Sequence, residues 1–178
     1  AMTKFVNFLT ITRIIAAPVI LFFLIIQNYL ICTLLFFVAS LTDYFDGFLA
    51  RKHNAESQLG EILDPIADKI IIIFILIGLS VNLSSNLIAF LSSFIIAREI
   101  GISALRDFAS RNNLSDRTKV TFIAKTKTAI QLFTIGSYLL ALTLNFNLLI
   151  VISDVLLIIA TLITLYTGYD YTVNVFKK

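Results

Sequence analysis

The sequence predicts an all-α integral membrane protein with six transmembrane helices and both termini on the cytoplasmic side. Of its 178 residues, 58% are hydrophobic, and the mean hydropathy is +0.94. Soluble domains are typically about 45–50% apolar. Long apolar stretches alternate with short polar breaks, and basic residues occupy only every second break. We therefore expect one membrane domain over residues 1–178, with no separate soluble unit.

The expected helices follow from apolar stretches of about 20 residues, the length that crosses a bilayer. They cover residues 11–27, 30–50, 61–81, 86–108, 120–144 and 148–172, and residues 3–10 could form a short interfacial helix ahead of the first. Polar residues fill the breaks at 27–28, 51–57, 82–86, 110–119 and 145–147. This division gives a bundle of antiparallel neighbours joined by short loops.

Lysine and arginine residues orient the bundle. Arg51 and Lys52 lie in the second loop, and Arg111, Arg117 and Lys119 lie in the fourth. The first, third and fifth loops contain neither lysine nor arginine. Because basic loops stay on the cytoplasmic side, the second loop, the fourth loop and both termini are expected there. The net charge of +3 is explained by this topology, so nucleic acid is not an expected partner.

Four aspartates interrupt the apolar pattern where the second helix ends and the third begins. Asp43 and Asp46 are three residues apart, and Asp64 and Asp68 are four residues apart. Each pair therefore shares one helix face. Charged groups inside a membrane are costly and usually functional. The hairpin formed by the two helices would bring both pairs together at the cytoplasmic rim.

Four ionised carboxylates in a low-dielectric site repel one another unless they take up protons or bind metal. Two divalent cations would balance their charge, and oxygen ligands favour Mg²⁺ or Mn²⁺ over zinc. A two-metal site is suited to displacement at phosphorus. Two alternatives are a polar network with Arg51 and Lys69, and an ion pathway in a transporter. The clustering of the acids at one rim fits a relay across the bilayer less well.

The spacing around these acids is D-x2-D-G-x2-A-R-x8-G-x3-D-x3-D. It is met by Asp43, Asp46, Gly47, Ala50, Arg51, Gly60, Asp64 and Asp68. This pattern resembles the signature of the CDP-alcohol phosphotransferase family, and the six-helix plan of the whole chain is also similar to that family. The resemblance implies an enzyme that transfers a substituted phosphate from a CDP-linked donor to an alcohol and releases CMP.

The resemblance also implies roles for individual residues. Asp43 and Asp64 would bridge two metals, Asp46 would complete one site, and Asp68 would complete the other and act as general base. The spacing by itself does not choose the base among the four acids. The residues implied to bind the CDP-linked donor are Asn7, Thr10, Gly47, Ala50, Arg51, Ser57 and Gly60.

Four further cations lie within or beside the fourth and fifth helices. Arg98 and Arg106 are eight residues apart, about 12 Å along a helix. Lys125 and Lys127 open the fifth helix from the same side. Together they could form a basic pocket for a phosphorylated alcohol. The alternative is that these side chains reach outward to lipid headgroups.

Four stretches resemble the branch of the family that uses glycerol 3-phosphate as acceptor: NFLTITRIIAAP (7–18), LDPIADK (63–69), AREIGISALR (97–106) and KTKTAIQ (125–131). Val6 stands where that branch usually has proline. The implied reaction joins CDP-diacylglycerol and glycerol 3-phosphate to give phosphatidylglycerol phosphate and CMP. A cardiolipin synthase or a phosphatidylinositol-phosphate-type synthase would share the donor motif.

The resemblance further implies a homodimer embedded in membrane lipid. A bacterial inner membrane is expected, and a mitochondrial inner membrane is the alternative. Asp154, in the sixth predicted helix, has no role in the motif. A dimer contact or a polar tie to another helix is favoured for it over catalysis.

Overall fold

The computed structural model is helical throughout the residues it describes, which are 2–53, 58–112 and 122–176. Side chains are not described for residues 2–6, 43–53, 58–62, 64, 65, 68 and 122–125. The helices are α1 (Met2–Ile25), α2 (Tyr29–His53), α3 (Gln58–Asn82), α4 (Asn86–Arg111), α5 (Phe122–Leu144) and α6 (Asn147–Phe176). The prediction of six helices is confirmed, with boundaries that differ by a few residues.

The expected separate helix over residues 3–10 is wrong. α1 runs without a break from Met2 to Ile25, and the Thr12 hydroxyl donates to the Phe8 carbonyl at 2.8 Å. Neither glycine nor proline occurs before Pro18, so nothing interrupts the backbone ladder between the interfacial segment and the apolar stretch. The segment is the first part of the same helix.

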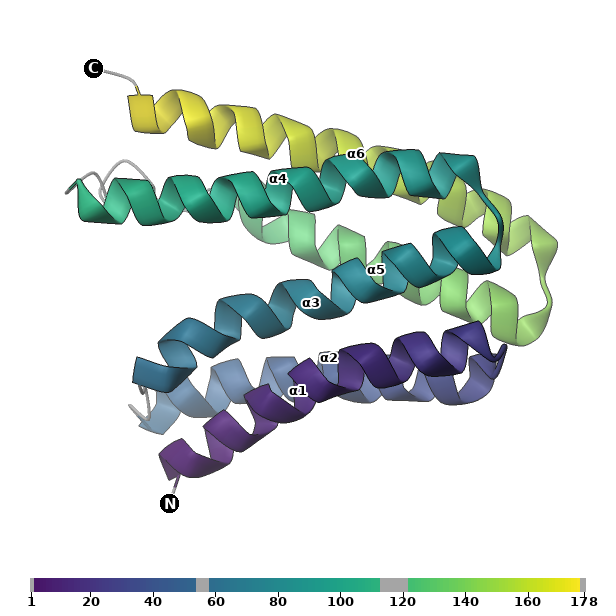
Figure 1. The fold of residues 1–178 in the computed structure, drawn as a ribbon, viewed down its shortest axis with the longest axis horizontal. Helices are drawn as coiled ribbons and strands as arrows, with labels where there is room; N and C mark the ends of the chain where they lie inside the picture. The colour runs from purple at the N-terminus through teal and green to yellow at the C-terminus, as the bar shows by residue number, and fades with distance from the viewer. Residues whose placement is uncertain (1, 54–57, 113–121, 177–178) are drawn as a thin grey trace.

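The helices form a closed ring. α1 packs against α2 and α3, α3 against α4, α4 against α6, α6 against α5, and α5 against α2, while α5 also contacts α3 across the ring. Figure 1 shows that α1, α3 and α5 begin at the same end of the bundle, where α2, α4 and α6 finish. We call this the terminal end and the opposite one the turn end. The alternation agrees with the expected antiparallel order.

Short turns close the bundle at the turn end. Each contains one non-glycine residue with positive φ: Gln27 (60°), Ser84 (46°) and Asn145 (52°). Ser85 then caps α4, because its hydroxyl accepts a hydrogen bond from the Ile88 amide at 3.2 Å. These residues reverse the chain within a few positions.

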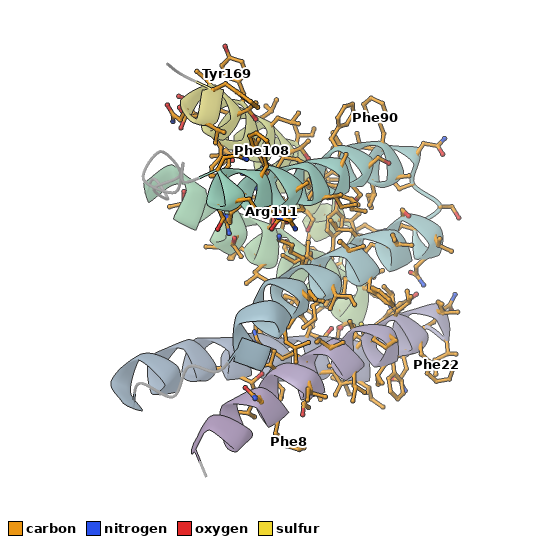
Figure 2. The ribbon with its side chains drawn as sticks, turned by 60° about the vertical axis from the view of Figure 1, so that its left-hand side comes forward. Phe8, Phe22, Phe90, Phe108, Arg111 and Tyr169 are labelled. Atoms are coloured by element: carbon orange, nitrogen blue, oxygen red, sulfur yellow. The ribbon has the colours of Figure 1, made fainter. Side chains whose placement is uncertain are left out.

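The interior is apolar through most of the bundle, and the outside is apolar as well. Ile20, Leu24, Ile75 and Leu79 are completely or almost completely buried, as are Leu139 and Leu157. A Cβ atom on Gly78 would lie 2.7 Å from the Leu24 side chain, so this glycine permits the close approach of α1 and α3. In Figure 2, Phe22 on α1 and Phe90 on α4 point outward, as expected for side chains that face lipid.

Within the described ranges, four segments are long and apolar enough to cross a membrane: 7–25, Asn86–Arg111, Thr126–Leu144 and Asn147–Phe176. α2 and α3 have shorter apolar stretches, Tyr29–Thr42 and Lys69–Asn82, and their polar ends carry the four aspartates. The protein is therefore an all-helical membrane protein. Whether α2 and α3 also cross the membrane stays a prediction.

Candidate functional site

The four aspartates belong to the terminal end of the bundle. Asp43 and Asp46 lie in the second half of α2, and Asp64 and Asp68 lie in the first half of α3. Only five Cα–Cα steps separate His53 from Gln58, so these two helix ends are at most about 18 Å apart. The carboxylates lie outside the described side chains, and their grouping stays a prediction. A set of four oxygen donors on two adjoining helix ends fits the chemistry of Mg²⁺ or Mn²⁺.

The residues predicted to bind the donor are divided between α1 and the same two helix ends. Thr10 is completely buried, and Asn7 is partly buried one turn earlier on α1. Both have interactions with other groups of the chain. Gly47, Ala50, Arg51 and Gly60 belong to helical segments whose side chains are not described, and Ser57 lies outside the described residues altogether.

A buried ion cluster joins α4 and α5. The Lys127 ammonium donates to Glu99 Oε1, and an Arg98 guanidinium nitrogen donates to the same oxygen at 3.3 Å. The side chains of Lys127 and Glu99 are only 9% and 8% exposed. Two of the predicted acceptor cations therefore meet inside the bundle, which excludes the alternative that they reach outward to lipid headgroups. They share a carboxylate to which the sequence analysis gave no role.

Arg98 also forms hydrogen bonds with α6. Its Nε donates to the Thr164 carbonyl, and a terminal nitrogen donates to the Thr167 hydroxyl, both at 3.1 Å. A Cβ atom on Gly168 would lie 3.0 Å from Arg98 Cγ, so the absence of a side chain there makes room for the arginine. These two contacts and the one to Glu99 use three of the five guanidinium N–H groups, and the other two have no partner among the described residues.

Lys69 connects the aspartate-bearing start of α3 to the same cluster. Its ammonium donates to the Ser103 hydroxyl, and that hydroxyl donates to the Glu99 carbonyl at 2.7 Å. Lys69 directly follows Asp68 in the sequence, and its charge lies close enough to Lys127 for the two to repel. Lys69 therefore links the start of α3, which carries two of the predicted metal ligands, to the cations of α4 and α5.

Arg106 lies farther along α4, toward the terminal end, and is exposed. Its guanidinium carbon is 6.0 Å from the centroid of the Tyr171 ring, within the range of a cation–π contact. Its charge lies close enough to Arg98 for the two to repel. The side chain of Lys125, the last predicted acceptor cation, lies outside the described ones.

We call Lys69, Arg98, Arg106, Lys127 and Glu99 the basic cluster. Among the described side chains it contains four cations and one carboxylate, and Lys69 also interacts with a further group of the chain. Sequence reasoning missed Glu99, the threonines of α6, and Gln131, whose amide donates to the Thr164 hydroxyl at 2.8 Å. Gln131 could have been found from its position in the sequence, because it follows Lys127 by four residues and therefore lies on the same face of α5. The cluster is suited to an anionic ligand beside the aspartates.

Asp154 is bound within the chain. The Tyr138 hydroxyl donates to Asp154 Oδ1 at 2.5 Å, and the neighbouring Ser137 and Ser153 hydroxyls are 2.7 Å apart. Both contacts join α5 to α6 near the turn end. The prediction of a polar tie to another helix is therefore confirmed.

Comparison with known proteins shows what the chain is similar to. The family model for CDP-alcohol phosphatidyltransferase matches residues 4–171. The chain is similar to proteins named CDP-diacylglycerol–glycerol-3-phosphate 3-phosphatidyltransferase. The one from Rickettsia bellii is 39% identical over 93% of this chain and 91% of its own length. Those from Blochmanniella floridana and Haemophilus influenzae are 40% and 35% identical, over 94% and 92% of this chain and 88% and 89% of their own.

Proposed function

Because this chain belongs to the CDP-alcohol phosphatidyltransferase family, we propose that it transfers the phosphatidyl group of CDP-diacylglycerol to glycerol 3-phosphate. The products are phosphatidylglycerol phosphate and CMP, so the enzyme acts in phospholipid biosynthesis as a phosphatidylglycerophosphate synthase. The observation that carries the proposal is the match to relatives named for this reaction along more than nine-tenths of the chain. The basic cluster supports the acceptor, because a phosphorylated alcohol needs fixed cations and plain alcohols do not.

Asp43, Asp46, Asp64 and Asp68 are proposed to hold two divalent cations, Mg²⁺ or Mn²⁺. Asp43 and Asp64 would serve as ligands for both ions, and Asp46 and Asp68 would each serve as a ligand for one. Bound there, the ions supply charge stabilisation at the donor's phosphorus-bound oxygens. Asp68 accepts the proton of the acceptor hydroxyl as that oxygen attacks phosphorus, and CMP leaves.

The donor is proposed to bind on the α1 side of the acids. Asn7 and Thr10 contact it from α1, and Gly47, Ala50, Arg51, Ser57 and Gly60 contact it from the hairpin between α2 and α3. Thr10 is already buried against the rest of the bundle, so this part of the site is fixed before the donor binds. Arg51 offers two parallel N–H groups to a phosphate.

The acceptor phosphate is proposed to bind to Arg98, Arg106 and Lys127 of the basic cluster and to Lys125, the residue two positions before Lys127. Lys127 and Arg98 are already oriented by Glu99, and Arg98 is also fastened to α6. Such pre-oriented cations lose little freedom when the anion arrives. The contact between Lys69 and Ser103 supports a pocket close to Asp68, because Lys69 follows Asp68 directly in the sequence.

The topology proposed is six spans, with the terminal end on the cytoplasmic side of a bacterial inner membrane and the protein acting as a homodimer. The relatives named above come from bacteria. The basic residues of the second and fourth loops support this orientation. The terminal end then faces the compartment that contains glycerol 3-phosphate.

The test is CMP release by the purified protein in detergent with CDP-diacylglycerol and Mg²⁺. Glycerol 3-phosphate, phosphatidylglycerol, inositol phosphate and glycerol are offered one at a time. Rapid CMP release is expected with glycerol 3-phosphate and with none of the other three compounds. Preference for phosphatidylglycerol would identify a cardiolipin synthase, preference for inositol phosphate the related synthase, and ion flux in vesicles without CMP release a transporter.

A further inference from the structure

The hydroxyl of Tyr171 is buried and has no hydrogen-bond partner among the described residues. Buried polar atoms in folded proteins are nearly always paired. A hydroxyl removed from water without a partner costs free energy, and the cost is greater beside lipid than beside water. An orphan of this kind therefore indicates a partner outside the described part of the chain, and a bound ligand can supply it.

Tyr171 belongs to the inward face of α6 that borders the basic cluster. It lies one helical turn beyond Thr167 and Gly168, the two residues on which Arg98 rests. The Arg106 guanidinium lies 6.0 Å from the ring centroid. Arg98 is also close enough for its charge to interact with Tyr171. The phenol therefore lies against Arg106 and one turn beyond the residues that hold Arg98, at the terminal end.

The surroundings of the hydroxyl determine what it can bind. A cationic ligand is repelled by Arg98 and Arg106, which both lie nearby. An anionic oxygen is attracted by both arginines and accepts the phenolic proton as a hydrogen bond. Phosphate oxygens meet this requirement, whether they belong to a soluble phosphomonoester or to a lipid headgroup.

We propose that Tyr171 is a further substrate-binding residue, whose hydroxyl donates a hydrogen bond to a phosphate oxygen of the acceptor. The inference rests on the proposed function and adds an uncharged hydrogen-bond donor to the proposed glycerol 3-phosphate site. The contact with Arg106 holds the ring in place, so the hydroxyl is positioned before the acceptor binds. Arg98, from α4, and the phenol of Tyr171, from α6, then bind the same phosphate.

The test is Tyr171→Phe, which removes one hydroxyl and keeps the ring beneath Arg106. The KM for glycerol 3-phosphate should rise about tenfold or more, the usual effect of losing a hydrogen bond to a charged group. The KM for CDP-diacylglycerol should stay within about twofold of the wild type. The Tm measured without acceptor should be unchanged or higher, because the substitution removes an unpaired buried group.

Tyr138→Phe is the matched control, because the Tyr138 hydroxyl already donates to Asp154. The same chemical change should have the opposite signature there: a lower Tm and an unchanged KM for glycerol 3-phosphate. Both variants are assayed in mixed micelles with and without anionic lipid. A Tyr171→Phe defect that appears only in the lipid dependence would assign the hydroxyl to a bilayer headgroup and overturn the acceptor assignment.

The remaining outcomes separate this inference from the proposed function. An active wild type whose Tyr171→Phe variant has the same KM for glycerol 3-phosphate would refute the role of Tyr171 and leave the proposed function standing. A wild type that transfers phosphatidyl to no phosphorylated alcohol would overturn the proposed function and this inference together. Tyr171→Phe with a lowered Tm in the absence of acceptor would show that the hydroxyl has a structural partner.

Discussion

The two ends of the bundle use buried polar residues in opposite ways. At the turn end, Tyr138 is paired with Asp154 and Ser137 with Ser153, while the buried Ser92 hydroxyl has no partner among the described residues and no cation of the basic cluster lies beside it. At the terminal end, the cations of the basic cluster outnumber Glu99. Matched polar groups need no ligand, whereas several cations beside an unpaired hydroxyl do. Polarity inside a membrane bundle therefore marks a binding site where an unpaired hydroxyl and several cations occur together.

The comparison fails if both ends of the bundle lie on the same side of the membrane, and cysteine labelling can test this. Single cysteines at Ser84, at the turn end, and at Asn112, at the terminal end, are both exposed in the structure. The native Cys32 is buried and should not react. An impermeant thiol reagent added to sealed right-side-out vesicles should label position 84 and spare position 112. Labelling of both from the outside would contradict the proposed topology.

The largest effect on activity is expected from Asp68→Asn, which removes the proposed general base and keeps the shape of the side chain. Turnover should fall by about 10²- to 10⁴-fold, the usual contribution of a general base. Donor binding should remain close to the wild type and can be measured with CDP-diacylglycerol in the absence of acceptor. Near-normal turnover would remove Asp68 from this role. EDTA should abolish wild-type activity, and Mg²⁺ or Mn²⁺ should restore it.

A smaller effect is expected at the turn end. Asp154→Asn replaces a carboxylate that accepts from Tyr138, so the hydrogen bond weakens but the packing is kept. Interhelical hydrogen bonds in membranes contribute about 0.5–2 kcal/mol, and the Tm should fall accordingly. The KM values for both substrates should be unchanged. A selective loss of acceptor affinity in this variant would mean that the turn end also takes part in the site.

Much of the fold could be predicted from the sequence, because apolar length and the placement of basic residues determine helix number and order. The possible short helix over residues 3–10 is not separate, because α1 continues through this segment from Met2 to Ile25. The family could be predicted because its aspartates lie on two helices with fixed spacing. Glu99 and Tyr171 could not be assigned, because their roles depend on which side chains three different helices bring beside them.

The role of Arg98 was also partly predictable from the sequence. Arg98 was expected to bind the acceptor phosphate, and its sequence position gave no sign that α6 would take up part of its hydrogen-bonding capacity. The importance of Gly168 is visible only in the folded structure, where the absence of a side chain leaves room for Arg98. The signal for a long-range pair of this kind lies in tertiary packing.

The measurement that tests the account most directly is the ratio of kcat/KM for glycerol 3-phosphate to kcat/KM for glycerol, in wild type and in Lys127→Met. Lys127 is buried against Glu99 in the basic cluster. The control is Arg111→Gln, because Arg111 is also at the terminal end but is exposed and paired with Asp107 at 2.9 Å (Figure 2). We expect a strong wild-type preference for glycerol 3-phosphate. Lys127→Met should lower it about ten- to a hundredfold and Arg111→Gln should leave it unchanged. An unchanged ratio in Lys127→Met would contradict recognition of the acceptor phosphate by the basic cluster.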